Sequence, residues 1–212
     1  MEKQKVERNY YLNGNIKSEY YYDENDKFYR NNDKPSVIHY YDDGSIESEQ
    51  WYVGTKLERS TGPAIIFYYK NGNIKSEIYS KDNMYHREDG PAIIHYFENG
   101  SIKRFSWHYY NEYHNENGPA KVAYFSSGSI KTELWCINGE NHRIDGPAIT
   151  YYYENGLKEV ERWYNHGVLH NENGPAEIYY KEDNIVMDKF YYINGKPMDE
   201  LQIEVLKSLN NG

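Results

Sequence analysis

The chain has 212 residues, of which 33 are acidic and 24 are basic, and its formal net charge is -9 at pH 7. Its mean hydropathy of -1.02 is very polar, but aromatic residues make up 17% of it, whereas disordered chains are poor in aromatics. The acidic balance argues against direct nucleic-acid binding and against attraction to anionic membranes. A single cysteine, Cys136, leaves no internal disulfide. Without an apolar leader or membrane-length segment, we expect a cytoplasmic protein.

Residues 1–34 are expected to form an N-terminal cap with one partial repeat. The segment Tyr10–Lys17 has the same pattern of aromatic, Asn-Gly and Ile-Lys residues as the later units. It lies 30 residues before its successor, whereas all later units are spaced by 28 residues.

Residues 35–196 contain six units of 28 residues, anchored by a Gly-Pro-Ala motif that is degenerate in the first unit. The anchoring prolines are Pro35, Pro63, Pro91, Pro119, Pro147 and Pro175. Positions are counted from this proline, so that +5 is the fifth residue after it. Every unit has tyrosine at +5 and a large aromatic residue at +16, and five units have glycine at +9, where the sixth has Asn184. A fixed register of this kind is typical of a repeat protein.

The third unit shows how one repeat is built. Residues 91–97 are rich in β-branched and aromatic residues, which favours a strand. Asn99-Gly100 then predicts a hairpin turn, residues 102–109 form the return strand, and a polar connection leads to Gly118-Pro119. We therefore predict an all-β, elongated tandem array of about six to seven hairpins in one long twisted antiparallel sheet. Six units would span roughly 58 Å.

Side-chain alternation in the first strand predicts which face is packed. Positions +1, +3 and +5 are nearly constant, whereas +2 and +4 vary, so we expect the constant face to be buried and the variable face to be exposed. The pattern leaves open whether the aromatic residue at +16 belongs to the core or to the surface. The fifth unit slips by one residue over Gly156–Val160, which predicts a bulge there.

Residues 197–212 differ from the repeats and predict a C-terminal capping helix. Pro197 would begin it, acidic residues follow, and Leu201, Val205 and Leu209 would form its apolar face. Together with the array it would form one continuous structural domain.

These motifs resemble MORN-type repeats over roughly residues 10–195. The pattern of Tyr68–Tyr79 carries the resemblance, and the His-Arg-x-Asp-Gly-Pro-Ala links at His86–Ala92 and His142–Ala148 are similar to the longer variant found in bacterial and large-virus proteins. The resemblance implies a ribbon of β-hairpins. It also implies scaffolding, membrane association or, for some bacterial members, the antitoxin of a toxin–antitoxin pair.

Three features contain residue types that can carry chemistry, and each has a structural explanation that we prefer. A histidine five residues before four of the prolines would fill a place in the link or bond a turn carbonyl, because units about 9.6 Å apart are too distant to share a metal ion. Carboxylates at one repeat position would form a solvated ladder with neighbouring lysines, and Cys136 has no base beyond His142 near it in sequence. The histidines are His86, His114, His142 and His170, and the carboxylates are Glu49, Glu77, Glu133 and Glu161. We expect no metal, no cofactor and no catalytic residues.

The function predicted best is binding of another protein, because an extended sheet presents repeated tyrosine and tryptophan side chains, which are enriched at interface hot spots. The acidic balance favours a basic partner, for example a nuclease or other effector covered by an inhibitor or antitoxin. The alternative is a structural or membrane-associated scaffold, which could self-associate through its end strands. For the binder we predict contacts through the variable face of the central repeats. The candidate residues are His95, Phe97, Phe125, Tyr151 and Tyr153.

Overall fold

The computed structural model describes residues 5–30 and 32–210, with the side chains of Leu206, Leu209 and Asn210 outside the description. The chain divides into two compact units, Met1–Asn111 and Glu112–Gly212, and each is described by itself. No helix among the described residues is long and apolar enough to cross a membrane.

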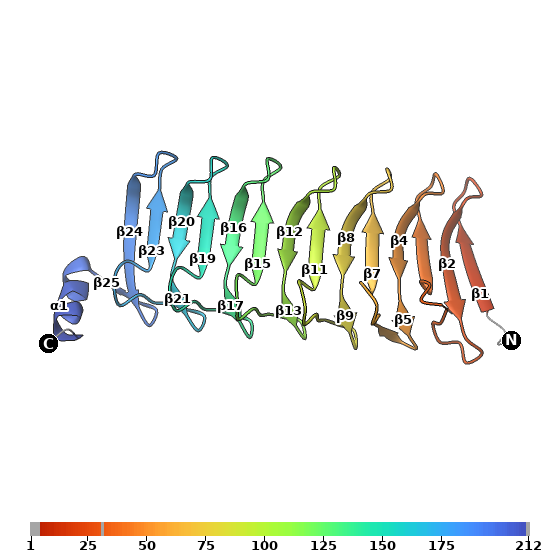
Figure 1. Cartoon of the computed structure of the whole chain (residues 1–212), viewed down its shortest axis with the longest axis horizontal. Helices are drawn as coiled ribbons and strands as arrows, with labels where there is room; N and C mark the ends of the chain where they lie inside the picture. Colours follow the sequence, from red (N-terminus) through yellow and green to blue (C-terminus); the bar gives the residue numbers. More distant parts are fainter. Residues whose placement is uncertain (1–4, 31, 211–212) are drawn as a thin grey trace. The chain divides into compact units, whose positions relative to one another are not determined.

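The first unit is built around an antiparallel sheet whose strands follow one another in chain order (Figure 1). Its strands are β1 (Lys5–Tyr10), β2 (Ile16–Tyr22), β3 (Val37–Tyr40), β4 (Ile46–Gln50), β7 (Ile65–Tyr68), β8 (Ile74–Ile78), β11 (Ile93–Tyr96) and β12 (Ile102–Ser106). Its links contain the short strands β5 (Tyr52–Val53), β6 (Lys56–Leu57), β9 (Ser80–Lys81), β10 (Met84–Tyr85) and β13 (His108–Tyr109).

The second unit repeats this plan and ends in the helix. Its sheet contains β15 (Lys121–Tyr124), β16 (Ile130–Leu134), β19 (Ile149–Tyr152), β20 (Lys158–Arg162), β23 (Glu177–Tyr180), β24 (Val186–Ile193) and β25 (Lys196–Met198), again in chain order. Its remaining elements are β14 (Glu112–Tyr113), β17 (Cys136–Ile137), β18 (Glu140–Asn141), β21 (Tyr164–Asn165), β22 (Val168–Leu169) and α1 (Glu200–Asn210). The predicted fold class, an antiparallel sheet of consecutive hairpins with a short C-terminal helix, is confirmed.

The hairpin turns differ in detail from the Asn-Gly turn that the sequence predicts. The residue at +9 has positive φ in every repeat, including Asn184 where glycine is replaced, but the residue before it does not. A three-residue loop that ends in a left-handed residue and a bulge explains this geometry. The register shifts between +4 and +5 in each repeat hairpin, as between His95 and Tyr96. The bulge that the sequence predicts for the fifth repeat alone is therefore a feature of all of them.

The links, which the sequence predicts to be polar connections, form second, smaller hairpins. Tyr52–Val53 pairs with Lys56–Leu57, for example, and Cys136–Ile137 pairs with Glu140–Asn141. In several links two consecutive residues have positive φ, as at Asn138-Gly139. This is the backbone of the tight two-residue turn that suits the twist of paired strands.

The constant face of the sheet is anchored at position +1. The five alanines there are 0% exposed: Ala64, Ala92, Ala120, Ala148 and Ala176. The constant tyrosines at +5 are half-buried, however, and so are most residues of the variable face, for example His95 and Tyr151. The contrast between the two faces is therefore smaller than the alternation predicts, because a hairpin sheet without a second layer leaves large rings partly open on both sides.

The recurring carboxylates are not a solvated ladder, and that prediction is wrong. Each accepts a hydrogen bond from the +5 tyrosine of the following hairpin, at 2.5–2.7 Å between oxygens. Glu19 and Glu161 are only 7% and 4% exposed. The pairs are Tyr40–Glu19, Tyr68–Glu49, Tyr96–Glu77, Tyr152–Glu133 and Tyr180–Glu161. Five of the six invariant tyrosines thus join their hairpin to the one before it; the sixth, Tyr124, follows a repeat that has Phe105 in place of the glutamate.

These pairs predict loss of stability in alkali. Burial, and then the bonded carboxylate, raises the pKa of Tyr68 and its four equivalents above the ordinary value of 10. A tyrosine whose pKa is raised by folding contributes stability that is present below the unfolded pKa and is lost as pH rises toward the folded pKa. We expect melting temperatures to fall above about pH 10. Absorbance at 295 nm should show these tyrosines ionising together with unfolding; a simple titration near pH 10 in the folded protein would contradict the pairs.

In three of the six repeats, the aromatic residue at +16, whose place the sequence leaves open, is covered by an arginine from the following link. Arg59 lies over Trp51 at 4.0 Å, Arg87 over Tyr79 at 3.9 Å, and Arg143 over Trp135 at 4.0 Å from guanidinium carbon to ring centroid. A guanidinium at this distance is attracted by the face of the ring. The +16 position is therefore part of the packing between sheet and link.

The capping helix differs from its prediction in both its start and its buried face. Pro197 lies in β25 and pairs with Tyr192, and α1 begins at Glu200. Leu201 and Val205 are 69% and 51% exposed, whereas Ile203 is 1% exposed. The side chain of Leu209 lies outside the described residues. Among the helix side chains that the structure describes, Ile203 is therefore the buried one, and the predicted apolar face is wrong for Leu201 and Val205.

Candidate interaction surfaces

The histidine ladder has a structural role in the links of the second unit. The Nδ1 atoms of His114, His142 and His170 accept hydrogen bonds from backbone N–H groups of the next link, at 3.1–3.3 Å. The sequence predicts that these histidines bond a turn carbonyl, but they instead accept hydrogen bonds from turn amides. In the first unit, His86 is 7% exposed and stacks on Tyr110 at 4.2 Å between ring centroids. No group of three or more metal-ligating side chains occurs among the described residues.

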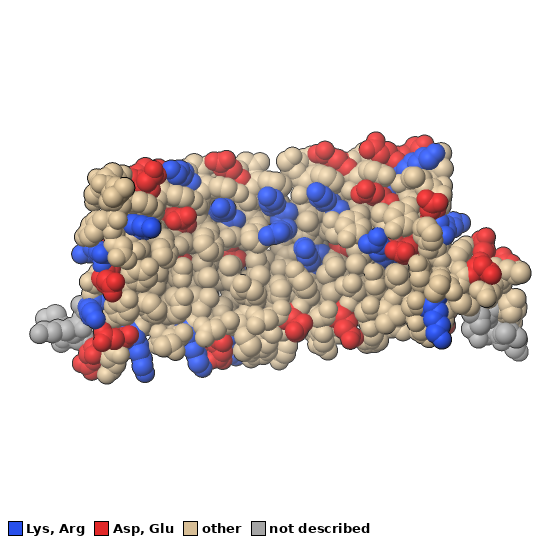
Figure 2. Space-filling model, turned by 180° about the vertical axis from the view of Figure 1, so that it is seen from behind, with Lys and Arg blue, Asp and Glu red and all other residues tan. Residues whose placement is uncertain are grey.

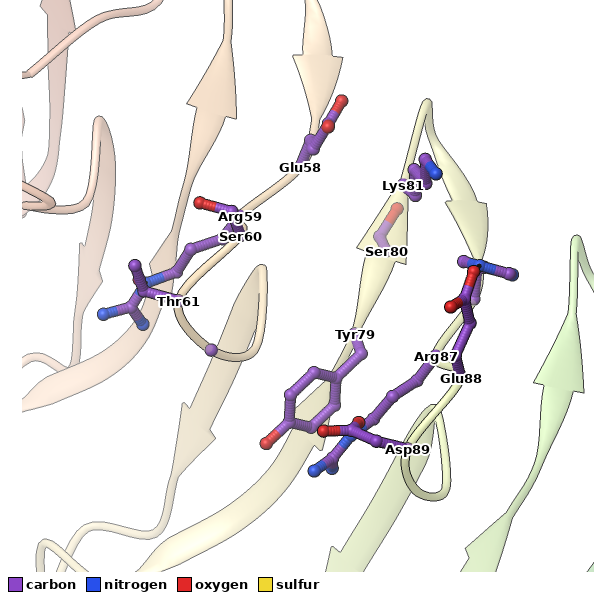
Figure 3. Close-up of a pocket in the computed structure, with 12 residues that line it drawn as sticks. Glu58, Arg59, Ser60, Thr61, Tyr79, Ser80, Lys81, Arg87, Glu88 and Asp89 are labelled. Carbon is purple, nitrogen blue, oxygen red and sulfur yellow. Dashed lines mark hydrogen bonds and ion pairs between the residues drawn. The ribbon is translucent and has the colours of Figure 1, made fainter.

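Neighbouring links leave open clefts between them, as Figure 3 shows in the first unit. There Glu58–Gly62 faces Tyr79–Lys81 and His86–Asp89 across a cleft of about 490 Å³. Arg87 lines it, but donates to Asp89 at 2.7 Å and covers Tyr79. The Ser80 hydroxyl donates to the Leu57 carbonyl at 2.9 Å. Arg87 and Ser80 are thus engaged in holding the link, and we assign no reaction to the cleft.

Cys136 is buried rather than poised for reaction. It is 2% exposed, and its Sγ donates to Asn141 Oδ1 at 3.1 Å. Burial raises the pKa of the thiol to about 11. Because the thiolate is the nucleophile, a thiol of this kind is inert near neutral pH.

We therefore expect iodoacetamide to leave Cys136 unmodified at pH 7.5 in the folded protein and to alkylate it after unfolding in urea. Intact-mass spectrometry of the two samples measures this directly. Stoichiometric labelling of the folded protein within minutes would contradict the burial of Cys136.

In the first unit, the predicted site residues His95 and Phe97 lie in a cationic environment. His95 Nε2 is 3.2 Å from Arg104 Nη2, and Lys103 Nζ lies 5.6 Å from the centroid of the Phe97 ring. Burial, and then Arg104, Lys103 and Lys75, lowers the pKa of His95 to about 4. His95 is therefore neutral at pH 7 among three cations, and this part of the surface does not suit the basic partner that the net charge predicts.

In the second unit, the predicted residues separate into two groups. Phe125 and Tyr153 come directly after their strands, at the base of the hairpin turns. The Tyr153 hydroxyl donates to the Tyr180 carbonyl at 2.8 Å, and Lys131 covers Phe125 at 5.3 Å. Tyr151 instead lies within β19, on the variable face. Tyr153 therefore bonds the neighbouring hairpin, whereas Tyr151 is half-buried on the variable face of the sheet.

Around Tyr151 the second unit has a cluster of large side chains, which we call the aromatic patch: Tyr151, Arg162, Tyr179 and Phe190. Arg162 lies 5.9 Å from the Tyr151 ring centroid and donates to the Tyr179 hydroxyl at 3.1 Å. Tyr179 and Phe190 form an edge-to-face pair at 5.9 Å, and Phe190 is 46% exposed.

The binding residues predicted from the sequence do not include Arg162, Tyr179 and Phe190. Tyr179 occupies the same +4 position as Tyr151, and Arg162 and Phe190 both occupy +15. The register pairs Arg162 with Glu177 and Glu177 with Phe190 on neighbouring strands. Comparing positions +4 and +15 across repeats is the signal that could have found them.

The charges of the aromatic patch nearly cancel. Arg162 donates to Glu177 at 2.8 Å, and their side chains are 29% and 14% exposed. On the face shown in Figure 2, acidic and basic atoms are interspersed along the edge with the hairpin turns, and neither sign dominates. Partner contact at the patch would rest on rings and hydroxyls rather than on net charge.

No protein-family model and no curated protein matches this chain. Membership of the MORN-type family therefore stays a prediction, and function is argued from the surfaces of the two units.

Proposed function

We propose that this chain is a non-enzymatic protein-binding module and that its partner contacts the aromatic patch of the second unit. The observation that supports this proposal is the half-open arrangement of Tyr151, Arg162, Tyr179 and Phe190, of which Phe190 is 46% exposed. Tyrosine and arginine are the residue types that most often dominate binding energy at interfaces, and rigid rings lose little entropy on binding.

A basic protein is the proposed partner, because the net charge of -9 would steer it toward the chain. One form of this function is an inhibitor or antitoxin that covers a nuclease or another basic effector. The cations around His95 favour the second unit over the first as the contact surface for such a partner. Association should then slow as salt is raised, because salt screens the attraction between exposed charges.

The test is a pull-down from the native host with three baits: the parent, Tyr151→Ala/Tyr179→Ala, and the control Phe67→Ala. Phe67 is half-buried and occupies the same +4 position in the first unit, which makes it a matched loss of an aromatic ring. We expect a protein that the parent and the control both retain and that the double variant loses by at least about tenfold. Thermal melts must show that all three baits are folded.

A folded double variant that still retains the protein would remove the aromatic patch as its site. The links around His114 and His142 would then be the next surface to substitute.

A further inference from the structure

The last repeat leaves one sheet edge open in the second unit. β24 pairs with β23 along Val186–Phe190, and β25 covers its other side only from Tyr191 to Ile193. No other described strand pairs with Val186–Phe190. In Figure 1, β25 and α1 lie at one end of β24, and no strand lies beyond its other part. A row of backbone N–H and C=O groups on such an edge is a template for another strand.

The strand pairs between neighbouring repeats show which backbone groups of this edge would bond an added strand. In the second unit, Val160, Glu161 and Arg162 pair with Tyr179, Ile178 and Glu177 of the next repeat. The Trp163 N–H donates to the Ala176 carbonyl at 2.8 Å. Backbone groups face alternate edges along an antiparallel strand, so Glu161, two residues before Trp163, also faces the next repeat. Lys189 is the equivalent of Glu161, and its N–H and C=O therefore face the open edge.

The side chains of this edge differ from those at the strand pairs between neighbouring repeats. Position +14 has glutamate in four repeats, and it bonds the tyrosine of the following hairpin, but here it is Lys189. No ion pair in the described part of the chain involves Lys189. Val186, Met187 and Phe190 are 41%, 54% and 46% exposed. A cleft of about 280 Å³ lies beside the edge, lined in part by Lys189, Phe190 and Met198.

We propose that the open edge of β24 binds an extended segment of a partner protein by adding it as one more antiparallel strand. The segment has an apolar residue opposite Phe190, an acidic residue opposite Lys189 and a basic residue opposite Asp188. Opposite charges that face each other across a strand pair are favourable, and like charges are not. The edge shares Phe190 with the aromatic patch, but this proposal rests on backbone pairing along β24 and on Lys189, neither of which the patch proposal uses.

A second copy of this chain fits the edge less well. Among the described strands the other end strand is β1, the first strand of the partial repeat, with Tyr10 paired to Ile16 as Tyr40 is to Ile46. In the register of the array, Lys189 would lie opposite Arg8 of that copy. Like charges directly opposite each other are destabilising, so the edge favours a different, acidic segment.

The probe is a fluorescent synthetic peptide with the order alanine, valine, glutamate, lysine, tyrosine, aligned so that glutamate meets Lys189. Binding to the full chain is measured by anisotropy. A peptide of the same sequence with an N-methyl group at glutamate is the backbone control, because it lacks the N–H that pairs with Lys189. We expect N-methylation to weaken binding at least tenfold.

Two variants test the edge from the protein side. Lys189→Pro removes the outward N–H at an edge, where proline is tolerated, and we expect it to weaken binding at least tenfold. Lys189→Glu should weaken binding about threefold and should prefer a peptide with lysine in place of glutamate. If Lys189→Pro does not fold, the N-methylated peptide on the parent protein decides the question.

The proposal is overturned if the peptide does not bind, if N-methylation leaves its affinity unchanged, or if Lys189→Glu keeps the original preference. Sedimentation of the parent without peptide gives a further outcome. Dimers or longer species that Lys189→Pro abolishes would show that a second copy occupies the edge, and they would overturn the choice of a foreign segment. Because the N-methylated peptide and the Lys189 variants leave every residue of the aromatic patch unchanged, a failure here leaves the pull-down result to be judged separately.

Discussion

Tyr96→Ala is expected to lower the free energy of unfolding by about 3 kcal/mol, because it removes a half-buried ring and leaves the Glu77 carboxylate without its hydroxyl partner. Tyr96→Phe should cost about 1 kcal/mol, the ordinary net value of one hydrogen bond. His95→Ala, on the opposite face, should cost about 1 kcal/mol or less. Urea unfolding of the parent and the three variants measures these differences.

The comparison between the adjacent residues Tyr96 and His95 tests which face of the sheet contributes more to stability. Equal losses for Tyr96→Ala and His95→Ala would show that both faces contribute alike and that the constant face has no special role in packing. A loss for Tyr96→Phe as large as that for Tyr96→Ala would assign the effect to the hydroxyl rather than to the ring.

The second large effect is expected at Glu161, a carboxylate that is 4% exposed. It accepts hydrogen bonds from Tyr180 Oη and Lys158 Nζ, each at 2.5 Å. Glu161→Ala leaves both donors without their acceptor, and we expect a loss of about 3 kcal/mol. Glu161→Gln should recover part of this loss, because the amide oxygen can still accept from Tyr180.

The matched control is Glu159→Ala, which removes an exposed carboxylate from the same strand. Substitutions at exposed positions without partners usually change stability by less than about 0.5 kcal/mol. Thermal and urea unfolding of both variants give the comparison. If Glu159→Ala and Glu161→Ala proved equally mild, the carboxylates would be a solvated ladder after all.

The repeat made most of the fold predictable from the sequence. Six prolines spaced by 28 residues set the hairpins in register, and the constant alanine at +1 is buried wherever it occurs. Only part of the role of the +5 tyrosine could be predicted from the sequence. Its invariance indicated packing, but its bond to a glutamate of the preceding hairpin depends on a pairing between repeats that one repeat alone does not show.

Other features depend on geometry that sequence patterns describe poorly. The register shift between +4 and +5 occurs in every repeat hairpin, whatever its sequence, so a slip in one repeat could not indicate that all repeats have it. In the helix, Leu201 and Val205 have the expected spacing, but Ile203 is the buried side chain among those that the structure describes. Of the predicted site, Tyr151 lies among arginine and aromatic neighbours, whereas Phe125 and Tyr153 brace hairpin turns.

Small-angle X-ray scattering tests the central prediction from the sequence most directly, namely that the 28-residue repeats form an elongated tandem array. A compact domain of 212 residues would have a radius of gyration of about 17 Å. Hairpins added at about 9.6 Å per repeat predict an elongated particle with a clearly larger value, above about 20 Å, and a skewed pair-distance distribution. A value near 17 Å with a symmetric distribution would contradict the account.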